Sequence, residues 1–205
     1  ARRFFLPVNV VAIPGAPIGR TKNSRGTPVE GALPSEVIFK GINDSAAWAD
    51  IVLEVKAVDI EGNSRIVHQG GHALNPDAAD ELVRVPAEAL KPGEFLYFTW
   101  TDGNGAVLGE NDFFPRAHKY YDIAPTEVSA SWSLEDGMPV LTLSADKPAF
   151  FVTASVDAPG HFSDNAITLI PGVARKLVFT PHDRAPASLD SLEKSCVVMH
   201  LRETY

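Results

Sequence analysis

Short runs of β-branched and aromatic residues recur along this chain, roughly every 8 to 15 residues, and turn-forming residues bound each run. This rhythm is typical of an all-β sandwich or barrel and leaves little room for long helices. The length of 205 residues allows either two domains of about 100 residues or one large domain. Such domains bury a hydrophobic core without disulfides, and the single cysteine, Cys196, cannot form an internal one.

The first part of the sequence predicts about seven strands, close to the number in an immunoglobulin-like sandwich. Alternation is clearest in residues 50–59, where Ile51, Leu53 and Val55 would share one face. Asp102-Gly103-Asn104-Gly105 predicts a tight hairpin turn, and residues 14–34 are expected to form a long loop. The expected strands cover residues 4–13, 36–42, 50–59, 65–69, 81–85, 95–101 and 106–114.

A proline-bounded stretch, residues 115–125, then interrupts the rhythm and predicts a linker. We expect Tyr120, Tyr121 and Ile123 to bury against the sandwich that follows. After the linker, the expected strands cover residues 128–134, 139–145, 149–156, 167–170, 174–180 and 196–202, with one helix over 188–194 capped by Ser188. The sequence therefore predicts two consecutive immunoglobulin-like antiparallel β-sandwich domains, residues 1–121 and 122–205.

The formal net charge of −8 argues against a nucleic-acid partner and against an anionic membrane surface, since both need a basic face. No apolar run approaches the roughly 20 residues of a membrane span. The sequence does not begin with Met, and we interpret it as a piece of a longer protein. The single cysteine favours the cytoplasm, although localisation stays open because an export signal could precede Ala1.

Motifs that carry chemistry are scarce. There is no Gly-x-Ser-x-Gly elbow and no Gly-rich phosphate loop. His68 and His72 lie four residues apart without further zinc-type ligands, so we interpret them as separate surface imidazoles. Cys196 is expected to be a core residue, and Asp157, His161 and Asp164 to be turn residues. We therefore predict no catalytic, cofactor-binding or metal-binding residue and no cofactor.

Aromatic residues supply the one binding chemistry that the sequence suggests. Trp48, Trp100 and Trp132 could stack on sugar rings if they were exposed, although core packing is the commoner use of such side chains. Residues 90–97 predict a tyrosine corner at the start of a strand, with the Tyr97 hydroxyl bonded back to backbone.

One segment is more specific. Phe162-Ser163-Asp164-Asn165 followed by Leu169-Ile170-Pro171-Gly172 resembles the last domain of the β-mannosidases of glycoside hydrolase family 2. Residues 140–152 resemble the central strand pair of that domain. Further matching segments are residues 2–8, 42–45, 58–62 and 111–114. The resemblance covers nearly the whole chain, and it departs from the family at residues 14–34 and 181–195.

This resemblance implies a multidomain retaining exo-glycosidase that releases terminal β-D-mannose with two Glu residues on a (β/α)₈ barrel. That barrel would precede Ala1, so no family catalytic residue is carried over to this chain. The resemblance further implies that the two sandwiches brace the barrel of the same parent chain. The parent would act on a β-mannoside or an oligosaccharide, and the 205-residue chain alone would be inactive.

Three alternatives stay open. The chain could be a carbohydrate-binding accessory module, which exposed Trp or Tyr on one sheet face would support. It could be the equivalent part of a related family 2 enzyme such as an exo-β-glucosaminidase. It could also be a free-standing immunoglobulin-like interaction protein, against which the beginning of the sequence argues.

Overall fold

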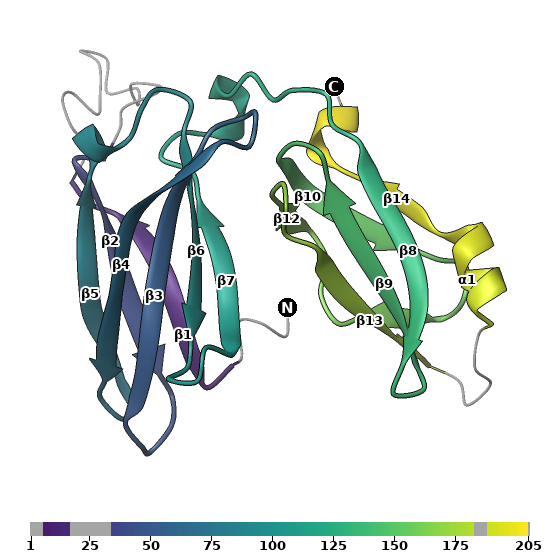
Figure 1. The fold of residues 1–205 in the computed structure, drawn as a ribbon, viewed down its shortest axis with the longest axis horizontal. Coiled ribbons are helices and arrows are strands. Elements are labelled where there is room, and N and C mark those ends of the chain that lie inside the picture. Colours follow the sequence, from purple (N-terminus) through teal and green to yellow (C-terminus); the bar gives the residue numbers. More distant parts are fainter. Residues whose placement is uncertain (1–5, 17–33, 183–187, 205) are drawn as a thin grey trace, which may run out of the picture. The chain divides into compact units, whose positions relative to one another are not determined.

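A computed structural model describes residues 6–16, 34–182 and 188–204 of the chain (Figure 1). The chain divides into two compact units, which we call the first unit (Leu6–Asp122) and the second unit (Ile123–Tyr205). Within the described ranges, no helix is long and apolar enough to cross a membrane.

The first unit is a sandwich of two antiparallel sheets (Figure 1). One sheet has the strand order β1-β2-β5, and the other has the order β4-β3-β6-β7. This division of successive strands between two sheets is that of the immunoglobulin fold. The strand bounds are β1 (Val8–Pro14), β2 (Glu36–Asn43), β3 (Ala49–Val58), β4 (Ser64–Leu74), β5 (Ala78–Pro86), β6 (Phe95–Thr101) and β7 (Val107–Phe113), with short 3₁₀ turns η2 (Ala87–Ala89) and η3 (His118–Tyr120).

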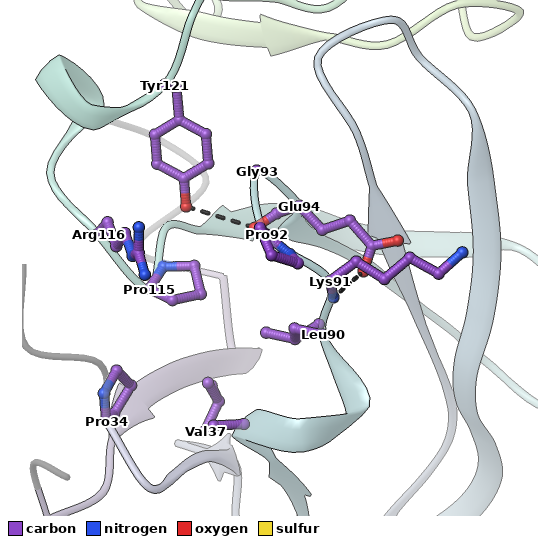
Figure 2. Close-up of a pocket in the computed structure, with 11 residues that line it drawn as sticks. Pro34, Val37, Leu90, Lys91, Pro92, Gly93, Glu94, Pro115, Arg116 and Tyr121 are labelled. Atoms are coloured by element: carbon purple, nitrogen blue, oxygen red, sulfur yellow. Dashed lines mark hydrogen bonds between the residues drawn. The ribbon is translucent and has the colours of Figure 1, made fainter.

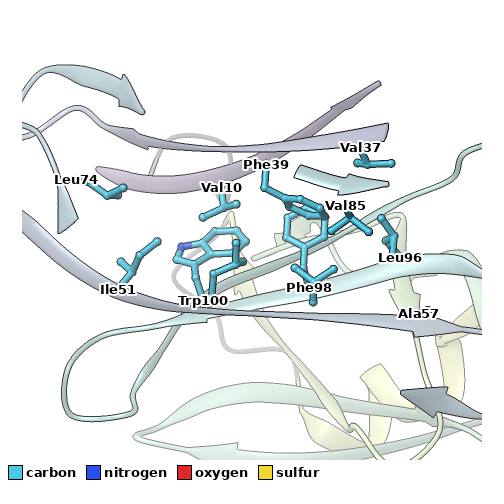
Figure 3. Packing of buried hydrophobic residues seen from close by; sticks show 12 residues of the cluster. Val10, Val37, Phe39, Ile51, Ala57, Leu74, Val85, Leu96, Phe98 and Trp100 are labelled. Atoms are coloured by element: carbon cyan, nitrogen blue, oxygen red, sulfur yellow. The ribbon is translucent and has the colours of Figure 1, made fainter. Parts of the chain in front are cut away.

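The core of the first unit lies between these sheets and follows from the alternation of their side chains (Figure 3). In β3, Ile51, Leu53 and Val55 are at most 1% exposed, because every second residue of the strand faces the opposite sheet. Phe39 on β2 meets Phe98 on β6 edge to face, with ring centroids 5.0 Å apart. This aromatic contact therefore helps to hold the two sheets together.

The second unit is built in the same way, with sheets β11-β13-β9-β8 and β12-β10-β14. Its core includes Leu141, Leu143, Val152, Ile167 and Leu177. The element bounds are β8 (Val128–Glu135), β9 (Met138–Ala145), β10 (Ala149–Ser155), β11 (Gly160–Phe162), β12 (Ile167–Leu169), β13 (Arg175–Pro181), α1 (Leu189–Ser195), β14 (Val197–Met199) and η4 (Leu201–Thr204).

The structure confirms the all-β, immunoglobulin-like fold class and the expected helix, whose cap Ser188 accepts a hydrogen bond from the Ser191 amide at 3.2 Å. The sequence did not predict strand β11. The strand expected at 196–202 is wrong beyond Met199, because the chain turns there into η4. Residues 1–5, 17–33 and 183–187, which fall in the expected first strand, long loop and late insertion, lie outside the described residues.

Gly109 on β7 tests the packing of the first unit. It lies opposite Trp100, and a Cβ at this position would come within 2.6 Å of the indole Cε2. We expect Gly109→Ala to lower the free energy of unfolding by about 1–3 kcal/mol, because the buried indole has to move. Urea denaturation followed by tryptophan fluorescence measures this loss. Gly103→Ala is the matched control, since a Cβ there meets nothing within 4 Å, and an equal loss in both variants would contradict the packing argument.

Candidate functional site

The segment that carries the family resemblance connects the two sheets of the second unit. Phe162 ends β11 in one sheet, and Ile167 begins β12 in the other. On the way, the Ser163 amide donates to the Val178 carbonyl at 2.8 Å, and the Ser163 hydroxyl accepts from the Val178 amide at 3.0 Å. Ser163 therefore extends the pairing of β13 by one residue.

Asn165 makes the corresponding contacts with the other sheet. Its side-chain oxygen accepts from the Ala154 amide at 2.9 Å, and its side-chain nitrogen donates to the Ala154 carbonyl at 3.1 Å. The amide side chain thus satisfies both backbone groups of one β10 residue, as a neighbouring strand would. Ala166 then adopts a left-handed φ of 54°, which turns the chain into β12.

The second half of the motif is a reverse turn. The Val173 amide donates to the Ile170 carbonyl at 3.2 Å, and Gly172 has a φ of 79°. Pro followed by Gly at the two central positions is the sequence of a type II turn. The Phe162–Gly172 motif therefore shapes the sandwich, and its polar side chains are bonded to backbone.

A cavity of about 90 Å³ lies at the end of the first unit where β6 begins (Figure 2). Pro34, Pro92, Pro115 and Leu90 form much of its wall, and Glu94 and Tyr121 contribute polar groups. The Lys91 amide donates to the Glu94 carboxylate at 2.7 Å, as Figure 2 shows. The aliphatic and proline side chains that line the cavity suit a small apolar group.

The Glu94 carboxylate forms hydrogen bonds within the protein. Its carboxylate, on a residue only 8% exposed, receives two hydrogen bonds from Arg65, at 2.6 Å from Nη2 and 3.2 Å from Nε. Arg65 Nη2 also donates to the Ala89 carbonyl at 2.6 Å. A charge this deeply buried is stable only when it is paired and hydrogen-bonded, so we assign Glu94 a structural role.

The tyrosine corner predicted at Tyr97 is wrong. The Tyr97 hydroxyl bonds to the Glu110 carboxylate on β7, so Tyr97 is not the corner residue. The Tyr121 hydroxyl instead donates to the Glu94 carbonyl at 3.4 Å (Figure 2). Burial raises the pKa of Tyr121 to about 12, so the phenol stays protonated and keeps this bond at neutral pH.

Tyr121 also corrects the expected role of the linker. Its ring meets Phe114 edge to face at 5.3 Å, and Phe114 stacks on Phe95 at 4.9 Å and contacts His118 at 4.1 Å. Tyr121 therefore packs on the first unit, whereas the sequence was expected to bury it against the second sandwich. Tyr120 remains 39% exposed.

The three candidate tryptophans lie in different environments. Trp100 is 2% exposed and belongs to the core of the first unit, so its ring offers no face to a sugar. Trp132 is half-buried and contacts Phe162. Trp48 is 65% exposed, on a turn that Asn43 holds through its side-chain nitrogen, which donates to the Ala47 carbonyl at 2.8 Å. Of the three, Trp48 has the exposure that stacking on a sugar ring requires.

The two histidines interpreted as separate imidazoles are in fact neighbours. Nε2 of His68 lies 3.2 Å from Nε2 of His72 on strand β4. Residues four apart on a strand share one face, and this period-2 signal could have revealed the pair in the sequence. Burial lowers the pKa of both imidazoles, and the proximity of His68 lowers that of His72 further.

The remaining polar motifs have structural roles. Asp102 accepts hydrogen bonds from the Asn104 and Ala106 amides, both at 2.9 Å, so this segment forms the predicted hairpin turn. Asp164 accepts from the Asn165 amide at 2.9 Å. Cys196 is half-buried, and burial raises the pKa of its thiol, so it stays protonated.

Comparison with known proteins agrees with this fold. Residues 123–204 match the family model Ig_mannosidase, an Ig-fold domain. The second unit thus matches an Ig-fold domain of the mannosidase type, which confirms the resemblance found in residues 162–172. At the level of sequence, no curated protein matches the chain.

Solved structures resemble the chain over more of its length. The β-D-mannosidase from Dictyoglomus thermophilum covers 97% of the chain with a TM-score of 0.76 at 16% identity. The exo-chitosanase CsxA from Amycolatopsis orientalis covers 80% with a TM-score of 0.56 at 17% identity. The chain spans only 22% and 24% of these two proteins, respectively. At this level of identity the likeness shows a shared fold.

Asn165 tests the structural interpretation of the motif. We expect Asn165→Ala to lower the free energy of unfolding by about 1–2 kcal/mol, because both backbone groups of Ala154 lose their partner. Asn165→Asp should also destabilise the fold, since a carboxylate still accepts from the Ala154 amide but places a second acceptor oxygen against the Ala154 carbonyl. Chemical denaturation of the three proteins measures these losses, and an alanine variant as stable as the parent would contradict the interpretation.

Proposed function

We propose that this chain is the non-catalytic C-terminal part of a β-mannosidase-like retaining exo-glycosidase of family 2. The match of residues 123–204 to the Ig_mannosidase model carries this proposal. The likeness of almost the whole chain to 22% of the Dictyoglomus β-D-mannosidase supports it. In this proposal, residues 1–121 follow a catalytic barrel, and residues 122–205 form the C-terminal domain.

The proposed role is to brace that barrel. The polar side chains of the Phe162–Gly172 motif and the Arg65–Glu94 pair are bonded within their own units, so they stabilise rather than react. The surface of the second unit carries exposed apolar side chains, among them Val197 and Met199 on β14, each 53% exposed. Exposed apolar groups of this kind suit contact with another domain.

Activity measurements test the proposal directly. We expect the 205-residue chain to release no p-nitrophenol from p-nitrophenyl β-D-mannoside, because the catalytic pair would lie on the barrel. The complete gene product should hydrolyse this substrate and release β-mannose first, as retention requires. Turnover by the isolated chain would contradict the proposal. Hydrolysis of the β-D-glucosaminide in preference to the mannoside would favour an exo-β-glucosaminidase, as the likeness to CsxA also allows.

The exposure of Trp48 favours a second candidate function, a carbohydrate-binding accessory module. The ring is 65% exposed and sits on a turn fixed by Asn43, so its face is available for stacking on a pyranose.

Titration calorimetry with mannose, mannobiose and chitosan oligomers distinguishes the two functions. An accessory module should bind one of these sugars more tightly than about 1 mM, and Trp48→Ala should abolish the heat. Trp132→Phe is the control, because it keeps an aromatic ring against Phe162. Flat heats for the parent chain would reject the binding module and leave bracing as the proposed role.

A further inference from the structure

Strand β4 carries a pair of imidazoles that the proposed glycosidase role does not use. His68 and His72 pair with Val55 and Ile51 of β3, which are at most 1% exposed. Directly opposite residues of an antiparallel pair point to the same face, so both imidazoles lie on the inner face of the sheet. Strand β4 is the first in the order β4-β3-β6-β7 (Figure 1). The pair therefore sits at an edge of the sheet, and both histidines are half-buried.

The separation of the two rings matches that of two ligands on one metal ion. Their Nε2 atoms are 3.2 Å apart. Metal–nitrogen bonds of about 2.0–2.1 Å place two ligand nitrogens about 2.8–3.4 Å apart, for angles between a right angle and the tetrahedral angle. The imidazoles therefore need little movement to bind the same ion.

Gly70 makes this approach possible. It lies between the two histidines on the same face, and a Cβ there would be 3.3 Å from His68 Nε2 and 3.7 Å from His72 Nε2. A larger side chain would therefore crowd both ligand atoms. Gly71 points to the opposite face, where a Cβ would meet only the Ile51 carbonyl oxygen, at 4.0 Å.

The protonation of the pair also suits a metal ion, because a ligand imidazole must be neutral. Burial lowers the pKa of both histidines below the ordinary value of 6.5. At neutral pH each ring then carries a single proton. Binding through both Nε2 atoms requires only that both protons reside on Nδ1, so no net proton release is needed.

We propose that His68 and His72 form a two-histidine site for a divalent transition-metal ion at the inner edge of strand β4. Imidazole ligands suit Zn²⁺, Ni²⁺ and Cu²⁺ rather than Mg²⁺ or Ca²⁺, which prefer oxygen. Water fills the remaining coordination positions. Affinity follows the usual order for nitrogen ligands, with Cu²⁺ bound most tightly and Mn²⁺ least. The ion joins two points of the edge strand, and it stabilises the first unit because it binds the folded state.

Calorimetry of the untagged 205-residue chain tests the site, with ZnCl₂, NiCl₂ and MgCl₂ as titrants at about pH 7.5, where neutral imidazole predominates. We expect one ion of Zn²⁺ or Ni²⁺ per chain and no binding of Mg²⁺. His68→Asn and His72→Asn should each weaken Ni²⁺ binding by at least about tenfold. The double variant His161→Asn/His182→Asn removes another close pair of rings, with centroids 5.7 Å apart, and should bind like the parent.

Two glycine variants test the site while leaving both histidines in place. Gly70→Val should weaken Ni²⁺ binding by at least about tenfold by crowding the imidazoles, whereas Gly71→Val on the same strand should not. Circular dichroism establishes that both variants fold. The proposal is overturned if the parent chain gives no heat with Zn²⁺ or Ni²⁺, if His72→Asn binds like the parent, or if the two glycine variants bind equally well.

Discussion

In each unit, two sheets packed about 10 Å apart share a single layer of interdigitating side chains, and the other features adapt to this constraint. Bulky core residues require small partners, as Trp100 requires Gly109. The chain must also pass from one sheet to the other, and each passage exposes backbone groups that need hydrogen bonds. Asn43 and Asn165 meet this need with their side-chain amides.

This constraint explains why the most specific sequence motif carries no reaction. Within residues 162–172, Ser163 is bonded to β13 and Asn165 to β10. Such residues identify the fold because few other side chains can form hydrogen bonds with the backbone of each sheet where the chain crosses between them. They are already bonded to backbone, so the choice of sugar by a parent enzyme would rest on residues outside this motif.

The sequence predicted the features that depend on neighbours along the chain. Alternation located β3, and the residues Asp102 to Gly105 located the hairpin between β6 and β7. Strand β11 was missed because three residues, Gly160–Phe162, are too few to show a period. Long-range packing decides the rest. Whether Tyr97 or Tyr121 bonds to the backbone beside the start of β6 depends on how the segment after β7 folds back, which local propensity does not encode.

The histidine pair differs from these cases, because both residues lie on one face of a single edge strand. An edge presents unpaired backbone groups that invite pairing with other chains, and proteins counter this with polar groups that point inward. His68 and His72 occupy such positions, on the inner face of β4, while Leu74 farther along that face is fully buried. Gly70 leaves the space in which the two rings meet. The pair on this edge strand has the spacing of two metal ligands, so a bound ion would reinforce β4.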